Sequence, residues 1–238
     1  MGKWDNGVEN QQSDSELTAS LSKVVAIVLD WNGTAVNDIR RALAATNRVL
    51  AEMAIPALSL ERFHETFRLP MDSYFSALGV LKVDIEEAVA DWNRFLVGGP
   101  IELSSGVLEM LKAAERAGIP VGVVSAASPD VVRADARVLG IERSLSLIVG
   151  NARVKSAALR EISTELGGLV LYCGDTEYDM IEAKIAGALP VAFAGGYRSA
   201  ADLLKTEPLL VIEDFFEIAR GLNALALTGG GMPRASAD

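Results

Sequence analysis

A run of six apolar residues that ends in an aspartate constrains the fold of this 238-residue chain more than any other stretch. Residues 24–29 read Val-Val-Ala-Ile-Val-Leu, and Asp30 follows directly. Such a run predicts a central β-strand that is covered on both faces. A buried aspartate is costly to desolvate without a partner, and open α/β sheets bind ligands at the carboxyl ends of their strands. We therefore expect other parts of the chain to supply partners for Asp30.

Helix and strand patterns alternate from Ser104 onward. Each stretch with helical spacing ends near a glycine that suits a left-handed C-cap, and these glycines are Gly118, Gly140, Gly167 and Gly187. A short apolar run follows each of these four helices, and the runs lie at residues 121–124, 147–149, 169–173 and 190–193. A last apolar run lies at residues 209–212. Repeated β-α units with right-handed crossovers build a doubly wound parallel sheet with helices on both faces. The predicted fold class is therefore α/β and Rossmannoid.

A long stretch after the first strand contains no strand-like run. Residues 37–97 show helical spacing only, and Gly98-Gly99-Pro100 is typical of a return hinge. This pattern predicts a small all-helical cap domain inserted into the α/β core. The predicted organisation is a disordered lead (1–22), the core domain (23–36 and 101–226), the inserted cap (37–100) and a flexible tail (227–238).

Composition excludes several classes of function. The net charge of −10 argues against nucleic acid or an anionic membrane as a partner, since both require Lys and Arg to neutralise phosphates. No apolar run reaches the length of a membrane helix and the N-terminus carries no signal-peptide core, so we expect a cytoplasmic protein. The single cysteine, Cys173, excludes an internal disulfide and lies in an apolar run typical of a packed core thiol. The oligomeric state is left open.

Polar side chains follow the predicted strands where those strands end. Asp30 follows the first strand, Ser125 the second, and Asp175 and Asp179 the fourth, while Lys155 begins the helix after the third. Because parallel strands point the same way, we expect these groups to meet at one edge of the sheet. Clustered carboxylates repel each other unless a cation lies among them, and their hard oxygens favour Mg²⁺. The ammonium and hydroxyl groups beside them suit a phosphoryl group.

Four short motifs occur in order along the chain: Asp30-Trp31-Asn32-Gly33-Thr34, then Ser125, then Lys155, then Gly174-Asp175 with Asp179. Their residue types and order resemble the motifs of the haloacid dehalogenase (HAD) superfamily. The helical insert after the first motif resembles the cap of the phosphoglycolate phosphatase and β-phosphoglucomutase branch of that superfamily. The resemblance covers residues 24 to about 215, and it implies a hydrolase of a small phosphorylated metabolite.

The resemblance also implies a role for each motif residue. Asp30 is the implied nucleophile, which forms an aspartyl-phosphate. Ser125 and Lys155 are implied to bind the phosphoryl oxygens, and Thr34 to hydrogen-bond beside them. The implied Mg²⁺ ligands are Asp30, the main-chain carbonyl of Asn32, Asp175, and Asp179 as a further ligand or as an anchor behind the ligands.

Residue 32 departs from the pattern that the resemblance implies. Typical phosphatases of the superfamily carry a second aspartate there, which protonates the leaving alcohol and then activates water. The amide of Asn32 cannot exchange a proton near neutral pH, although its main-chain carbonyl is unchanged. Loss of such an acid-base group typically lowers the rate about 10²- to 10⁴-fold.

Asn32 leaves several interpretations open. The chain is a weakened phosphatase, a phospho-ligand-binding protein with impaired catalysis, or a phosphatase in which asparagine replaces aspartate by engineering. The first is favoured because Ser125, Lys155 and Asp175 are all retained. A phosphonate-cleaving relative would use a Schiff-base lysine of the cap, where Lys82 is the only lysine and is better explained as a solvated side chain. A mutase-type relative would need a second acceptor hydroxyl.

Arg68 is the one candidate for substrate binding in the predicted cap. It lies two residues before Pro70 in a loop between two predicted helices, and in the resembled branch this loop faces the active site. Arg68 therefore either binds a carboxylate or second phosphate of the leaving group or forms a surface ion pair.

Overall fold

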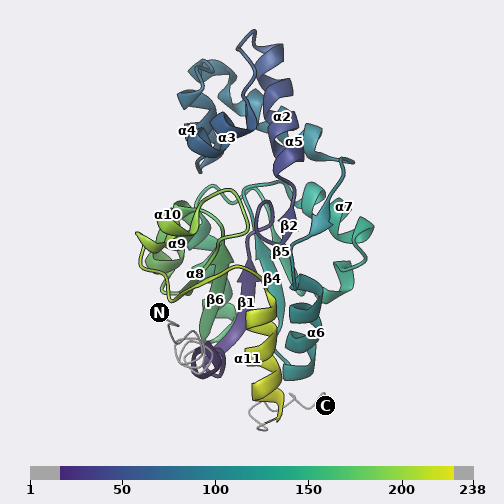
Figure 1. Ribbon diagram of the computed structural model, residues 1–238, viewed down its shortest axis with the longest axis vertical. Helices are drawn as coiled ribbons and strands as arrows, with labels where there is room; N and C mark the ends of the chain where they lie inside the picture. The colour runs from purple at the N-terminus through teal and green to yellow at the C-terminus, as the bar shows by residue number, and fades with distance from the viewer. Residues whose placement is uncertain (1–16, 228–238) are drawn as a thin grey trace, which may run out of the picture.

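A six-stranded parallel sheet lies at the centre of the computed structural model, which describes residues 17–227 (Figure 1). Its strand order is β5-β4-β1-β6-β7-β8, so β1 is a central strand between β4 and β6. The strands are β1 (Val24–Leu29), β4 (Val121–Val124), β5 (Leu147–Val149), β6 (Leu169–Gly174), β7 (Leu189–Phe193) and β8 (Leu210–Ile212). The predicted α/β fold with a doubly wound parallel sheet is confirmed.

Helices cover both faces of this sheet because each strand is apolar on both sides. Ile27 and Leu29 of β1 pack in one cluster with α6, α7 and α11, whereas Ala26 and Val28 pack in another with α8 and α9. The helices of the core are α6 (Val107–Ala117), α7 (Pro129–Val138), α8 (Lys155–Leu166), α9 (Glu177–Ala186), α10 (Ala200–Leu204) and α11 (Phe216–Leu227), with a short 3₁₀ turn η2 (Glu142–Ser144). Within residues 17–227, no helix combines the length and apolarity needed to cross a membrane.

A helical insert stands above the carboxyl ends of the strands (Figure 1). It consists of α2 (Ile39–Glu52), α3 (Leu60–Thr66), α4 (Met71–Ala77), η1 (Lys82–Asp84) and α5 (Ile85–Leu96). The segments that enter and leave it pair as a small antiparallel sheet of β2 (Val36–Asn37) and β3 (Glu102–Leu103). The sequence did not predict this pair, because two-residue strands carry no periodicity.

The structure corrects the predicted ends of the ordered chain. Residues 17–21, which we predicted within a disordered lead at 1–22, form a helical turn. Leu17 and Leu21 lie one helical turn apart and are both buried, so they bury a shared face against the core. Leu227, predicted to begin the flexible tail, is the last residue of α11. The remainder of the predicted lead and tail lies outside the described residues.

Candidate active site

The carboxyl ends of the central strands carry the side chains at the centre of the site. The register pairs Leu29 of β1 with residues near the ends of both β4 and β6, so the residues that follow these three strands lie close together. Asp30, Ser125 and Asp175 occupy those positions and are buried. The structure therefore brings together residues that are distant in the sequence, as the strand pattern predicted.

Lys155, the first residue of α8, lies fully buried beside Asp30. Its Nζ is 3.0 Å from Asp30 Oδ1 and 2.6 Å from Asp179 Oδ1. Burial alone would lower the pKa of Lys155, but the charges of Asp179 and Asp30 outweigh burial and raise that pKa. Lys155 is therefore an ammonium ion that offsets negative charge next to Asp30.

Asp179 pairs with Lys155 and also caps the start of α9, in which it is the third residue. Its Oδ1 also accepts a hydrogen bond from the Tyr172 hydroxyl at 3.1 Å. Its Oδ2 accepts from the Thr176 hydroxyl at 2.5 Å and from the Thr176 backbone N–H at 3.1 Å. Thr176 Oγ1 in turn accepts from the Asp179 backbone N–H at 3.3 Å, and the two reciprocal bonds to backbone N–H groups form a capping box. Since each Asp179 carboxylate oxygen already accepts two hydrogen bonds, the geometry favours the role of anchor over that of an open metal ligand.

Three buried carboxylates crowd this edge of the sheet. One oxygen each of Asp30, Asp175 and Asp179 lies within 4.8 Å of the others. Burial raises the pKa of Asp30 to about 6, against the lowering effect of Lys155, and burial together with the charges of Asp179 and Asp30 raises that of Asp175 well above its usual range. One ammonium cannot balance three carboxylates. The donor set therefore fits a divalent cation such as Mg²⁺, which Asp30, Asp175 and the main-chain carbonyl of Asn32 would hold.

The loop after β1 and the loop after β7 meet at Asp175. The Thr34 hydroxyl donates to Asp175 Oδ1 at 2.8 Å, and the Tyr197 backbone N–H donates to Oδ2 at 2.7 Å. Gly33 has a φ of +77°, and a Cβ there would collide with the Asp175 carboxylate. A Cβ at Gly196 would collide with the Gly33 carbonyl. Thr34, predicted to bind near the phosphoryl group, thus orients Asp175, and glycines allow the two loops to touch.

Ser125 offers its hydroxyl proton to the site. Its Oγ accepts a hydrogen bond from the Ala127 backbone N–H at 3.2 Å, and the side chain is buried. The Oγ therefore keeps its own O–H for another acceptor. This placement agrees with a serine that donates to a phosphoryl oxygen.

Asn32 lies in the nucleophile loop (residues 30–34), named for the predicted role of Asp30, and belongs to a buried hydrogen-bond network. Its Nδ2 donates to Asp38 Oδ2 at 2.6 Å. Asp38 also accepts from the Gly33 backbone N–H at 3.1 Å, from the Tyr197 hydroxyl at 2.8 Å, and from Arg41 Nε at 3.2 Å and Nη2 at 3.0 Å. The carboxylate of Asp38 is thus surrounded by donors from the insert, the nucleophile loop and the loop after β7.

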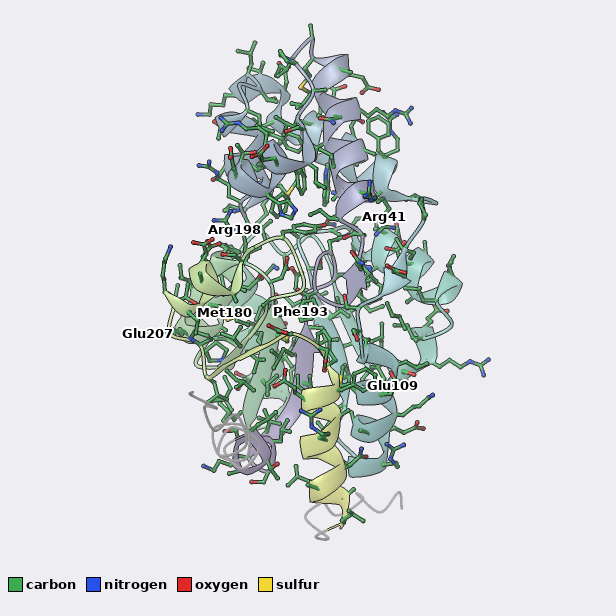
Figure 2. The ribbon with its side chains drawn as sticks, in the orientation of Figure 1. Arg41, Glu109, Met180, Phe193, Arg198 and Glu207 are labelled. Atoms are coloured by element: carbon green, nitrogen blue, oxygen red, sulfur yellow. The ribbon has the colours of Figure 1, made fainter. Side chains whose placement is uncertain are left out.

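Arg41 carries this network across the boundary between insert and core. Figure 2 shows Arg41 on α2 where the insert approaches the core. Its Nη1 and Nη2 donate to the two carboxylate oxygens of Asp135 on α7 at 2.7 and 2.8 Å, and Trp31 Nε1 donates to Asp135 at 3.0 Å. Sequence reasoning missed Asp38, Arg41 and Asp135, because each lies on or beside a helix where a charged residue is usually solvated.

A second contact joins the insert to the core near Arg198, which Figure 2 also labels. Arg198 Nη1 donates to the main-chain carbonyl of His64 on α3 at 2.9 Å, while its Nε and Nη2 pair with Glu177. His64 Nδ1 lies 2.9 Å from the carbonyl oxygen of Tyr197. The insert is therefore held to the core here as well as at Arg41.

A cleft of about 580 Å³ opens between the insert and the core. Residues that line it include Met71, Val89 and Asn93 from the insert and Ala126, Ser128 and Arg153 from the core. The lining reaches Ala126, which directly follows Ser125, but it includes neither Arg68 nor the buried residues at the strand ends, which are Asp30, Asn32, Ser125, Lys155 and Asp175. The Arg68 side chain is exposed, and its Nε donates to the carbonyl of Thr66 in its own loop at 3.2 Å. Of the predicted site residues, Arg68 is the one that the structure does not bring to the others.

Comparison with known proteins identifies the family. The haloacid dehalogenase-like hydrolase family matches residues 27–193, well over half of the chain. A protein of Dickeya dadantii named probable phosphatase IndB is 22% identical over 218 residues, which cover 84% of this chain and 94% of that protein. A phosphoglycolate phosphatase of Xanthomonas campestris pv. campestris is 25% identical over 190 residues, which cover 74% of this chain and 86% of that protein.

Solved structures share the fold over nearly their whole length. A protein described as a predicted phosphatase from Clostridium acetobutylicum has a TM-score of 0.75 at 15% identity, covering 84% of this chain and 98% of that one. A hydrolase from Pseudomonas syringae has a TM-score of 0.73 at 17% identity, covering 85% of this chain and 99% of that one. The family resemblance of the four motifs is thereby confirmed. The chain belongs to the haloacid dehalogenase-like hydrolases.

Proposed function

We propose that the protein is a Mg²⁺-dependent phosphatase that hydrolyses a small phosphorylated metabolite through an aspartyl-phosphate on Asp30. The observation that carries this proposal is the buried Asp30 carboxylate at the end of β1, with the Lys155 ammonium 3.0 Å away and Ser125 at the end of the neighbouring strand. The names of the Dickeya and Xanthomonas relatives support the same chemistry.

Each side chain has a defined task in the proposed reaction. A carboxylate oxygen of Asp30 attacks phosphorus as the ester oxygen departs, and water then hydrolyses the aspartyl-phosphate to release phosphate and restore Asp30. Lys155 and the Ser125 hydroxyl stabilise the charge on the transferring phosphoryl group. Bound Mg²⁺ would neutralise further charge on the phosphoryl oxygens. Because Asn32 cannot donate a proton, the fastest substrates are esters whose leaving oxygen needs little protonation.

The cleft between insert and core suits the leaving group of such an ester. Met71, Val89 and Ala126 give it apolar walls, while the exposed Arg153 offers a polar contact. Its volume of about 580 Å³ matches a small metabolite. Movement of the insert about its two linkers would admit the substrate and then exclude water.

Steady-state phosphate release tests the proposal. The parent protein is assayed with Mg²⁺ on phosphoglycolate, sugar phosphates and nucleotides, alongside Asp30→Asn and the control Asp202→Asn, which changes an exposed carboxylate on α10. We expect release by the parent and by the control, and loss of release in Asp30→Asn or with a chelator. Silence of the parent on the whole panel, or an active Asp30→Asn, would overturn the proposal.

A phospho-ligand-binding protein is the second candidate, and Asn32 is the observation that favours it. Calorimetry with phosphoglycolate and the other panel members separates the two functions. Saturable binding that requires Mg²⁺, without phosphate release, would establish the binding function. The phosphonate-cleaving alternative has no support in the geometry, since Lys82 is exposed at the start of η1.

A further inference from the structure

We propose that Asp38 is a positioning residue that orients the side chain of Asn32, so that Asn32 Oδ1 holds the attacking water or the departing hydroxyl by accepting a hydrogen bond. The role in the reaction rests on the proposed phosphatase function. The orientation itself rests only on the contact between Asn32 and Asp38 and on the other hydrogen bonds that hold Asp38.

The contact with Asp38 sets the direction of the Asn32 amide. Its Nδ2 lies 2.6 Å from Asp38 Oδ2, and the Asp38 side chain is fully buried. The reversed amide would set two acceptor oxygens against each other at that distance, away from water. The contact therefore determines the orientation of the amide, in which Nδ2 faces Asp38 and Oδ1 points away from it.

Asp38 cannot turn away from Asn32. Its Oδ1 is held by the Gly33 backbone N–H and the Tyr197 hydroxyl, and its Oδ2 also accepts from Arg41. Arg41 is itself fixed by two hydrogen bonds to Asp135. A carboxylate with donors on both oxygens has one favourable orientation.

The remaining polar atom of the amide is Asn32 Oδ1. Asn32 is only 8% exposed, and its Oδ1 is buried without a hydrogen-bond partner among residues 17–227. A buried acceptor of this kind requires a donor from water or ligand. The oxygen lies on the loop that carries Asp30, on the opposite end of the amide from Asp38. A hydroxyl at the reacting phosphorus would supply that donor, and Asn32 would orient it without taking its proton.

This arrangement explains why an aspartate would not simply restore the family's acid-base group at position 32. In Asn32→Asp, a second carboxylate would face Asp38 in a buried site, where like charges repel strongly. In the double variant Asn32→Asp with Asp38→Asn, donor and acceptor exchange places and the contact between positions 32 and 38 is rebuilt, although the hydrogen bonds from Arg41 to position 38 are lost. Asn37→Asp is the matched control, because Asn37 Nδ2 donates to the Glu102 carboxylate at 2.9 Å but at an exposed position.

Thermal unfolding in a chelating buffer tests the orientation without any substrate. We expect Asn32→Asp to lower the Tm by roughly 5 °C or more, and Asn37→Asp by less than about 2 °C. The double variant should lose clearly less than the sum of the losses that Asn32→Asp and Asp38→Asn cause separately. A loss for Asn32→Asp no larger than for Asn37→Asp, or additive losses in the double variant, would overturn the proposal.

Kinetics on a panel substrate, corrected for the folded fraction, test the role in the reaction. We expect Asp38→Asn to lower kcat by about 10²-fold with little change in KM, because Ser125 and Lys155 still bind the phosphoryl group. We expect Asn32→Asp to fall below the parent and the double variant to exceed Asn32→Asp. A tenfold or larger rise in kcat for Asn32→Asp alone would overturn the proposal. A silent parent would overturn the proposed function instead, while the unfolding comparison still decides the orientation.

Discussion

Two buried groups of charges flank the nucleophile loop, and they are balanced in different ways. The acidic cluster consists of Asp30, Asp175 and Asp179 with one ammonium, that of Lys155. The hinge network consists of two carboxylates around the Arg41 guanidinium, with neutral donors filling the remaining positions. The cluster therefore has two carboxylates in excess of its one cation, whereas the network has one, whose oxygens accept hydrogen bonds from neutral donors.

This difference separates a binding site from a structural joint. Burial, together with a smaller effect from the charge of Asp179, raises the pKa of Asp30 to about 6 against the lowering effect of Lys155. In the network, hydrogen bonds from Arg41 and from neutral donors satisfy the oxygens of both carboxylates and link α2, α7 and the nucleophile loop. The comparison predicts that variants of the cluster change metal binding and chemistry, whereas variants of the network change the joint between insert and core.

The largest expected effect follows removal of the ammonium from the cluster. Lys155→Met leaves Asp30 and Asp179 buried without their partner, so we expect a loss of about 3–5 kcal/mol in unfolding free energy and near-complete loss of phosphate release. Lys112→Met, an exposed lysine on α6, is the control and should change stability by less than about 0.5 kcal/mol. Urea unfolding measures both. Equal stability of the two variants would contradict the description of the cluster.

Removal of the guanidinium is the matching test of the network. Arg41→Met leaves Asp38 and Asp135 buried without a counterion, and we expect a stability loss of about 3–5 kcal/mol with a smaller loss of activity than for Lys155→Met. The adjacent Arg40→Met changes an exposed side chain on the same helix and serves as control. Metal affinity, measured by calorimetry, should be unchanged in Arg41→Met. A large loss of Mg²⁺ affinity would show that the two regions are not separate.

The pH dependence of stability sharpens the contrast. The pKa of Asp30 is 3.8 in its ordinary state and about 6 in the fold, so the folded state binds more protons between these values. Stability contributed by Asp30 therefore falls as pH rises through that window, by on the order of 3 kcal/mol when complete. We expect Mg²⁺ to raise the Tm more at pH 7.5 than at pH 5, and Asp30→Asn to lose this difference. A Tm increase that is the same at both pH values would contradict the cation site.

The smallest effect is expected at Thr34, which orients Asp175. Thr34→Val removes the 2.8 Å hydrogen bond to Asp175 Oδ1, and we expect a stability loss of about 1–3 kcal/mol with several-fold weaker Mg²⁺ binding. Thr34→Ser keeps the hydroxyl and should behave like the parent. Weaker binding in both variants would assign the effect to the lost methyl group instead.

The sequence predicted the sheet and its reactive edge because those features repeat locally. Each β-α unit carries its own periodicity, and the position of Asp30, Ser125 or Asp175 directly after an apolar run is readable without knowledge of the rest of the fold. Parallel strand direction then brings these residues to one edge. This reasoning is independent of side-chain conformation, which is why it succeeds.

The hinge network could not be predicted in the same way, because its contacts join distant residues whose local patterns look ordinary. Arg41 and Asp135 are 94 residues apart, and Asp135 lies inside α7 at a position that resembles a solvated helix acid. Arg68 shows the converse limit, because the sequence left open whether it binds substrate or lies on the surface. Its place in a cap loop suggested a contact with substrate, but the side chain points to its own loop and to solvent.

The central claim is that Asp30 is the nucleophile of a phosphatase, and rapid-quench mass spectrometry tests it most directly. The protein is mixed with Mg²⁺ and its fastest panel substrate, quenched in acid and digested. We predict phosphorylation of the peptide that carries Asp30, absent without Mg²⁺ and in Asp30→Asn, and readily detected because Asn32 cannot activate water for its hydrolysis. Phosphate release with no phosphorylated Asp30, or with the modification on another residue, would contradict the account.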